Sequence, residues 1–198
     1  MPTVEAIRDV LRGRLLDAGT LEPPSKNRMR AAVAILLRDG ARGPEILLIK
    51  RAEDPRDHWS GHIALPGGRW DDCDGALAAT ALRETREEVG IELGDDALLG
   101  RLARLSPVSR RLPAIDITPF VALAPPDAAV RANHEVAAHF WASVEKLRAT
   151  GPAAVFQLDL PGEPREFPAY DYDGHIIWGL TERILTGFLS LLDPARER

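Results

Sequence analysis

Residues 65–91, LPGGRWDDCDGALAATALRETREEVGI, decide how this chain is interpreted. The stretch opens with Pro66-Gly67-Gly68, which indicates a turn, and the following residues 75–90 lack proline and predict a helix. Six acidic side chains lie within it. Because like charges this close together destabilise a helix, either solvent or a cation must offset them.

The acids of the predicted helix gather on one side. At about 100° per residue, Glu84, Glu87 and Glu88 share one arc. Arg83 can pair with Glu87 four residues on, and Gly90 can end the helix. The nearly opposite arc is expected to face the core, and it holds Ala78, Leu82, Thr85 and Val89.

Two interpretations of the acidic face compete. The plain one is an ordinary solvated surface, helped by Arg83 and Arg86. The other is a metal site, because hard oxygen ligands without cysteine or histidine suit Mg²⁺ or Mn²⁺, usually shared with the phosphates of a substrate. The turn before the helix and the glycine after it favour the metal site.

The end of the stretch resembles the Nudix box, written G-x5-E-x7-R-E-U-x-E-E-x-G-U with U an aliphatic residue. RETREEVGI, which begins at Arg83, matches except that Thr85 occupies the first U position. The resemblance implies an α/β fold, a Nudix-like α/β/α sandwich with a mixed central sheet flanked by helices. It also implies Glu84, Glu87 and Glu88 as metal ligands, with Arg83 orienting Glu87.

The first half of the box departs from this pattern. Counted back from the helix, the expected Glu position holds Gly75 and the expected Gly position holds Arg69. One extra residue restores Gly68 to the start and leaves Asp74 as the nearby acid. Relatives often use a carbonyl of this turn as a metal ligand, so the resemblance implies Gly68 as a further ligand and Gly67-Gly68 as a close backbone approach to the substrate.

The implied reaction is the hydrolysis of a diphosphate linkage by water that a bound metal acidifies. A carboxylate must take the proton of that water. Glu88 is the first candidate, and Glu135 in NHEVAAHFW is the second, although a solvated strand end explains Glu135 equally well. The catalytic set implied by the resemblance is therefore Glu88, Glu87, Arg83 and Glu135.

Residues 47–68, LLIKRAEDPRDHWSGHIALPGG, resemble the element LLTxR[SA]x3Rx3Gx3FPGG that precedes the box in coenzyme A pyrophosphatases. Ile49 and Leu65 depart from it, and one extra residue lies between Arg56 and Gly61. The matching positions are Leu47, Leu48, Arg51, Ala52, Arg56, Gly61, Pro66, Gly67 and Gly68. Residues 177–181, IWGLT, resemble the terminal IWGxT segment of the same branch.

This branch implies that coenzyme A or a derivative is split into 3'-phosphoadenosine 5'-phosphate and 4'-phosphopantetheine. Arg51, Arg56 and Arg69 could bind its phosphates, although a solvated surface explains Arg69 at least as well. A Nudix hydrolase of ADP-ribose, dinucleotides or other nucleoside diphosphate derivatives is the first alternative. A non-catalytic nucleotide sensor is the second, and the intact glutamates disfavour it.

The length of the chain and its hydrophobic content favour one domain over residues 1–198. The apolar spacing of Val4, Ile7, Leu11 and Leu15 predicts a docking helix over residues 4–18. A second apolar helix is expected over residues 178–192, where either the monomer core or a homodimer could bury it. Strands are expected in between, the first two as a hairpin over residues 30–38 and 45–51.

Charge and cysteine content limit partners and compartment. The formal net charge of −5 gives no general attraction to nucleic acid or to an anionic membrane, so the expected partner is a small nucleoside diphosphate derivative. Cys73 is the sole cysteine, which favours a reducing, cytoplasmic location. His58 and His62 are expected in a loop rather than a zinc site. The large aromatic residues are expected in core or dimer contacts, although one could stack on an adenine; they are Trp59, Trp141, Trp178 and Phe188.

Overall fold

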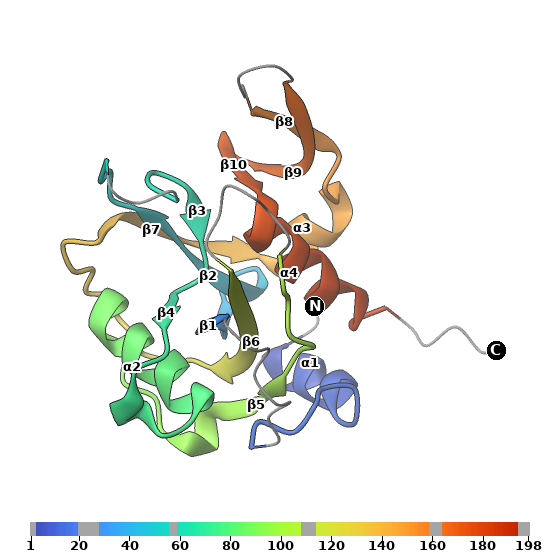
Figure 1. The fold of residues 1–198 in the computed structure, drawn as a ribbon. Helices are drawn as coiled ribbons and strands as arrows, with labels where there is room; N and C mark the ends of the chain where they lie inside the picture. The colour runs from blue at the N-terminus through green and yellow to red at the C-terminus, as the bar shows by residue number, and fades with distance from the viewer. Residues whose placement is uncertain (1–2, 20–27, 56–58, 108–113, 159–163, 194–198) are drawn as a thin grey trace.

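The structure is a computed structural model that describes residues 3–19, 28–55, 59–107, 114–158 and 164–193. Figure 1 shows a central sheet with helices on both sides and a smaller sheet standing at one end. This arrangement confirms the predicted α/β sandwich. In chain order the elements are α1 (Val4–Leu11), β1 (Met29–Gly40), β2 (Gly43–Arg51), β3 (Ile63–Ala64), β4 (Gly67–Arg69), η1 (Asp72–Asp74), α2 (Leu77–Val89), η2 (Asp95–Ala97), β5 (Leu98–Arg101), β6 (Ile115–Leu123), β7 (Val136–Ser143), α3 (Val144–Thr150), β8 (Ala154–Leu158), β9 (Arg165–Tyr172), β10 (His175–Trp178) and α4 (Gly179–Ser190).

The central sheet is mixed. β1 and β6 run parallel over nine residue pairs, from Met29 opposite Ile115 to Leu37 opposite Leu123. The other pairings of this sheet within the described residues are antiparallel, including the expected β1–β2 hairpin. β8, β9 and β10 form a separate antiparallel sheet.

A split between β1 and β2 creates room for the Pro-Gly-Gly turn. β1 pairs with β2 only from Leu37 onward, and its earlier residues pair instead with β4. β2 in turn pairs with β3 at its far end. Residues 63–69 therefore cross from one strand to the other, and the Ala34 N–H donates to the Pro66 carbonyl at 2.8 Å in the gap.

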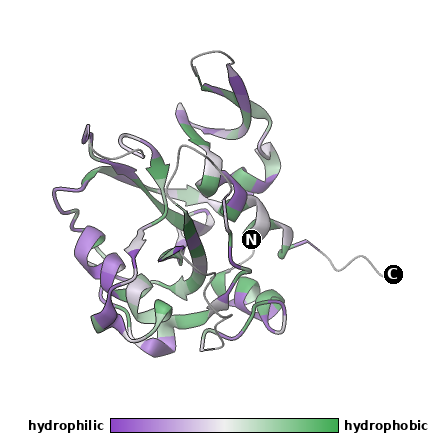
Figure 2. Cartoon of the chain, viewed as in Figure 1, coloured by the Kyte–Doolittle hydropathy of each residue, from purple (hydrophilic) through white to green (hydrophobic). Residues whose placement is uncertain are grey.

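The two faces of the central sheet carry different helices. α1, α3 and α4 pack their apolar side chains on one face, in a core that includes Ile35 and Leu48. α2 covers the other face, where Leu36 and Phe120 are fully buried. α2 carries both hydrophobic and hydrophilic residues, and its hydrophilic part stands out in Figure 2. Among the described residues, none of the helices is both long and apolar enough to cross a membrane.

The first helix is shorter than predicted. α1 ends at Leu11, not at residue 18, and Gly13 follows with a φ of 76°. The chain then turns toward the sheet, where the N–H and carbonyl of Leu16 each bond Arg101 at 2.9 Å. This pairing with a distant strand overrides the helical spacing of Leu15.

The C-terminal helix predicted over residues 178–192 is present as α4, which spans Gly179–Ser190. β10 comes just before it and pairs with β9, and α4 begins at Gly179 with a φ of 69°. The bulky apolar residues of α4 are buried within the chain itself: Ile184, Leu185, Phe188 and Leu189. The monomer core therefore accounts for the apolar face of this helix.

Candidate active site

The extra residue between Gly68 and Arg83, relative to the Nudix box, is accommodated by a short capped turn before α2. The Asp71 carboxylate accepts the Cys73 N–H at 3.0 Å, and the Asp74 carboxylate accepts the Asp71 N–H at 3.0 Å. This reciprocal capping forms the 3-10 turn η1, and Gly75 with a φ of 67° redirects the chain into α2. At its other end α2 stops at Gly90, which adopts the left-handed conformation with a φ of 67°.

The buried face of α2 is rotated from the predicted one. Thr85 and Val89 are fully buried as expected, but Ala78 and Leu82 are only partly buried, and Leu77 and Ala81 take their place in the core. The Thr85 hydroxyl donates to the Ala81 carbonyl at 2.7 Å. Because this bond satisfies the hydroxyl, threonine can occupy a position where the Nudix box has an aliphatic residue.

Glu88 lies under β4 rather than on a solvated stripe. Only 2% of the residue is exposed, and Glu88 Oε2 accepts the Gly67 N–H at 2.9 Å. Its Oε1 is 3.8 Å from Nη1 of Arg51. Burial is the main cause that raises the pKa of Glu88 to about 7, although the Gly67 N–H and Arg51 oppose the shift. The carboxyl is therefore set to exchange a proton near neutral pH.

Both glycines of the turn have close neighbours, and backbone contacts together with a positive φ require glycine at position 67. A Cβ on Gly67, whose φ is 156°, would lie 2.3 Å from the Ala32 carbonyl oxygen. A Cβ on Gly68 would lie 2.3 Å from the carboxyl of Glu84. The backbone of the turn thus lies directly against the carboxylates of Glu84 and Glu88.

Arg83 organises the acidic side chains of this region. Its Nε and Nη2 donate to the two oxygens of Asp74 at 2.7 and 3.0 Å. Its Nη1 donates to Glu84 at 2.9 Å and to Glu87 at 3.1 Å. The hydrogen bond from Arg83 holds the pKa of Asp74 well below its usual range. Asp74 is thus the main partner of Arg83, a role that its place outside the matched motif did not reveal.

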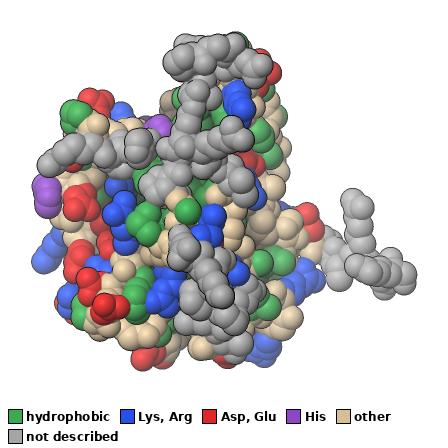
Figure 3. Space-filling view, in the orientation of Figure 1, with side chains coloured by type: hydrophobic (Ala, Val, Ile, Leu, Met, Phe, Trp, Pro, Cys, Tyr) green, Lys and Arg blue, Asp and Glu red, His purple; other side chains and the backbone are tan. Residues whose placement is uncertain are grey.

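The three glutamates occupy different environments. Glu87 is exposed, Glu84 is half-buried with a pKa that burial raises, and Glu88 is buried. In the part of the chain that the structure describes, they do not converge into a three-ligand cluster, because Glu84 and Glu87 bind Arg83 while Glu88 binds Gly67. Figure 3 shows acidic and basic side chains intermixed over the region that α2 occupies.

The donor set nevertheless fits a hard divalent cation. Its oxygens are carboxylates, and the Gly68 backbone lies directly against the Glu84 carboxyl. Burial raises the pKa of both Glu84 and Glu88, so their ionised forms lack full compensation within the chain.

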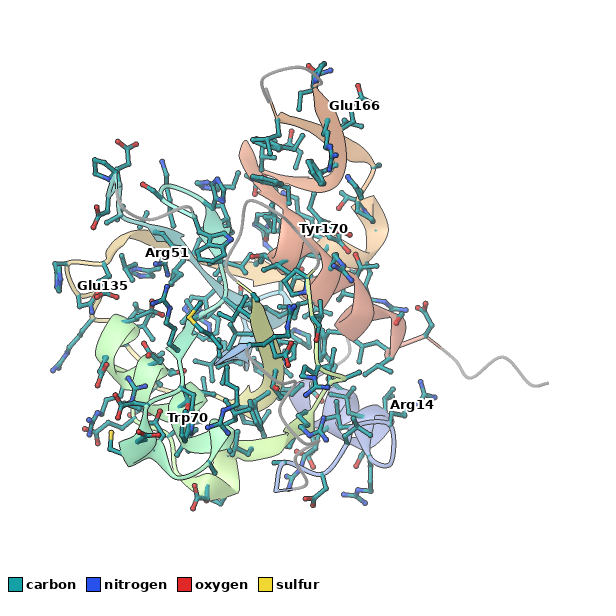
Figure 4. All side chains as sticks on the ribbon, viewed as in Figure 1. Arg14, Arg51, Trp70, Glu135, Glu166 and Tyr170 are labelled. Atoms are coloured by element: carbon teal, nitrogen blue, oxygen red, sulfur yellow. The ribbon has the colours of Figure 1, made fainter. Side chains whose placement is uncertain are left out.

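The other predicted residues are distributed around this centre. Glu135 is exposed on the loop before β7, and its charge contributes to raising the pKa of both Glu84 and Glu88. That loop is fixed to α2, because the Asn133 N–H donates to the Glu88 carbonyl at 2.9 Å. Arg51 and Glu135 lie on the same side of the molecule, above α2 (Figure 4).

Arg69 and Arg56 are the other two arginines predicted to bind phosphate. The side chain of Arg69 is exposed, and its carbonyl accepts Nη2 of Arg83 at 3.2 Å. Arg69 pairs with Ala31, one position from Gly68, so alternation along β4 directs its side chain away from the face that Gly68 shares with Glu84. Arg56 lies outside the described residues, as does His58.

Comparison with known proteins decides the family. The model of the NUDIX domain matches residues 28–160 of this chain. The Nudix hydrolase NudL of Photorhabdus laumondii subsp. laumondii is 34% identical over 170 residues, which cover 83% of this chain and 88% of NudL. The chain belongs to the Nudix hydrolase family. It is thus a pyrophosphohydrolase that acts on nucleoside diphosphate derivatives, in a family that generally uses divalent metal ions.

Solved structures share the Nudix fold. A MutT/nudix family protein from Enterococcus faecalis superposes with a TM-score of 0.60 at 16% identity, covering 90% of this chain and 68% of that protein. The NUDIX domain of Shewanella oneidensis NrtR, solved with ADP ribose, gives a TM-score of 0.51 at 21% identity, covering 67% of this chain and 83% of that domain. These likenesses confirm the fold that the Nudix box implied.

Proposed function

We propose that this Nudix hydrolase cleaves the diphosphate of coenzyme A or its derivatives, with Mg²⁺ or Mn²⁺ held by Glu84, Glu87, Glu88 and the Gly68 carbonyl. The observation that carries the site is the buried Glu88 carboxylate, placed between the Gly67 N–H and Arg51. A buried carboxylate with a pKa near 7 suits proton transfer.

Two features support coenzyme A as the substrate. Arg51 belongs to the segment that resembles the coenzyme A branch, and it lies 3.8 Å from Glu88, beside the site where a diphosphate would be split. The IWGLT segment, the other resemblance to that branch, packs on β3, because the Thr181 hydroxyl donates to the Ile63 carbonyl at 3.0 Å. The two segments that resemble the coenzyme A branch, residues 47–68 and 177–181, are therefore in contact, which supports the proposal.

The residues of the chain divide the chemistry among them. A divalent ion, when bound, draws charge from the diphosphate oxygens and acidifies a water. Glu88 accepts the proton of the attacking water, and Glu135 is the second candidate for that base. Arg51 binds the phosphates, with Arg56 as a further candidate, whereas the direction of the Arg69 side chain disfavours it; the Gly67-Gly68 backbone also faces the phosphates.

Metal binding requires the glutamates to move relative to Arg83. Glu84 and Glu87 share Nη1 of Arg83, whereas Nε and Nη2 also bond Asp74. Arg83 can therefore release Glu87 to the metal and stay in place through Asp74. In this way Arg83 positions the ligands without touching the substrate.

Variants of the glutamates test the site. Glu84→Gln and Glu88→Gln should lower the turnover of coenzyme A by orders of magnitude with the fold intact, because each removes a charged ligand. Glu92→Gln is the control, since Glu92 is exposed just beyond the same helix. Normal turnover in both site variants would show that the glutamates are not the metal site.

A substrate panel tests the specificity. The purified protein with Mg²⁺ would be given coenzyme A, its thioesters and ADP-ribose, and the products identified by mass. The proposal expects 3'-phosphoadenosine 5'-phosphate and 4'-phosphopantetheine. ADP-ribose is the chosen contrast because the NrtR domain was solved with it. Brisk cleavage of ADP-ribose without cleavage of coenzyme A would replace the coenzyme A proposal with an ADP-ribose hydrolase.

A further inference from the structure

Four aromatic side chains, which we call the aromatic cluster, gather where the small sheet meets the central one: His62, Phe156, Phe167 and Trp178. Trp178 stacks on Phe156 with ring centroids 4.0 Å apart and planes inclined by 15°. The His62 ring meets Trp178 nearly edge-on at 4.8 Å, and Phe167 lies tilted at 5.5 Å. All four are partly exposed, so the cluster is not a closed core.

The pairing of β3 with β2 places this cluster beside Arg51. Lys50 lies opposite Ile63, and the next step of the same register puts His62 opposite Arg51. The Arg51 N–H donates to the His62 carbonyl at 3.0 Å, which confirms that step. Residues opposite each other on antiparallel strands project to the same face, with Cβ atoms about 5 Å apart. This register directs the His62 and Arg51 side chains to the same face as neighbours.

These neighbours connect Glu88 to the aromatic cluster step by step. Arg51 reaches toward Glu88 at 3.8 Å, His62 stands next to Arg51, and Trp178 stands next to His62. β3 and β10 are in contact, and they adjoin in Figure 1. A phosphate-binding cation followed by flat rings matches the order of groups in a nucleotide, in which a sugar links the phosphates to an aromatic base.

We infer that the aromatic cluster, with His62 nearest the phosphates, binds the aromatic base of the substrate by stacking. The inference rests on the proposed function for the position of the phosphates. Stacking on aromatic rings uses the flat face that every base has, so it accepts different bases. The pantetheine arm of coenzyme A has no such face and is left to another part of the surface.

Binding of two simple ligands tests this inference without any turnover. AMP and ribose 5-phosphate share a phosphate and a ribose and differ in the base, and neither contains a diphosphate to be split. Titration calorimetry with Mg²⁺ present would measure both. The expected result is AMP binding about tenfold tighter than ribose 5-phosphate. Equal affinities, or failure of both to bind, would overturn the inference.

Variants identify the rings that are responsible. His62→Ala should abolish most of the preference for AMP, and His62→Phe should keep it because a ring remains. His175→Ala is the matched control: His175 stacks on Phe140 at 4.5 Å, on the opposite face of β10. Loss of affinity for both ligands in His62→Ala, or loss of the preference in the control, would contradict base stacking at His62.

The outcomes also separate this inference from the proposed function. If AMP is preferred through His62 but no diphosphate is hydrolysed, the base site stands and the proposed activity is wrong. If coenzyme A is hydrolysed but AMP and ribose 5-phosphate bind alike, the activity stands and the base site is wrong. Weaker binding of 4'-phosphopantetheine in His62→Ala, with AMP unaffected, would assign the cluster to the pantetheine arm and overturn the inference.

Discussion

At Glu88, burial and charge oppose each other. The carboxyl is almost fully buried and receives one backbone N–H from Gly67, with Arg51 at 3.8 Å. These contacts do not replace the water that the ionised form has lost, which is why its pKa rises to about 7. A divalent cation beside the carboxylate would supply the missing charge, so the stability of the fold and the proposed activity depend on the same group.

The metal-free protein should therefore become less stable as Glu88 ionises. The pKa of Glu88 rises from 4.5 to about 7 on folding, so between these values the folded state binds more protons than the unfolded state. Stability contributed by this group is full below the lower value and is lost as pH rises through the upper one. The shift corresponds to about 3 kcal/mol.

Urea unfolding in a chelator at a series of pH values would measure this effect. Relative to wild type, Glu88→Gln should gain about 3 kcal/mol of unfolding free energy between pH 5 and pH 8. Its amide can still accept the Gly67 N–H, so the variant keeps the local contact. If the unfolding free energies of the two proteins change in parallel with pH, burial does not raise the pKa of Glu88.

The sequence identified Glu88 but not its environment. A helix wheel places Glu84, Glu87 and Glu88 on one arc because it contains only the helix. Their separation into half-buried, exposed and buried positions comes from β4, which crosses above α2 and is held by pairing with β1. No local spacing in the sequence reports that crossing.

At the scale of the element, α2 is held in place by the fork between Arg83 and Asp74. Asp74 also accepts the Thr80 hydroxyl at 2.8 Å, so one carboxylate connects η1 to the first and second turns of α2. The helix, its glycine cap and the Pro-Gly-Gly turn were predictable because their signals are local. The one-residue displacement of the box hid the role of Asp74, since the acid stands one residue farther from Arg83 than the motif allows.

Removing the Asp74 carboxylate should loosen this element. Asp74→Asn should lower the unfolding free energy by about 2 kcal/mol, because Arg83 loses a charge-assisted pair of hydrogen bonds. Turnover should fall about tenfold or more, since Arg83 then rests on Glu84 and Glu87 alone. Chemical denaturation and steady-state kinetics would measure the two effects.

Asp72→Asn provides the control for this change, because Asp72 is an exposed acid in the same short turn. It should leave both stability and turnover near the wild-type values. An Asp74→Asn protein that is as active and stable as wild type would mean that Arg83 positions the glutamates without help from Asp74.

At the scale of the whole molecule, the segment after α1 contacts the segment after α4. Arg14 lies after α1, and its Nη1 donates to the carbonyls of Leu191 and Asp193 at 2.6 and 2.7 Å (Figure 4). The end of α1 at Leu11 was not predictable, because the chain after it pairs with the distant Arg101 rather than continuing the helical spacing. The C-terminal helix was predictable, because its apolar spacing is local. We propose that residues 1–198 fold as one cooperative unit, in which Arg14 links the segment after α1 to the segment after α4.

Arg14→Ala tests whether this link stabilises the fold. Loss of two hydrogen bonds from a charged donor should lower the unfolding free energy by about 1–3 kcal/mol and speed hydrogen exchange at the end of α4. Arg12→Ala should change stability by less than about 0.5 kcal/mol, because its side chain is 74% exposed and its ion pair is with the exposed Asp9. Fluorescence and circular dichroism should give one coincident transition in each protein. A separate early transition in Arg14→Ala would show that the ends form an independent unit.

The most direct test of the metal site is a crystal structure of the protein with Mn²⁺, in which anomalous density locates the ion. We predict density within direct coordination distance of Glu84 and Glu88 and of the Gly68 carbonyl, with Glu87 released from Arg83 and Arg83 still paired with Asp74. Density elsewhere, with Glu84 and Glu87 still bound to Arg83 and Glu88 still bound to Gly67, would contradict the proposed site.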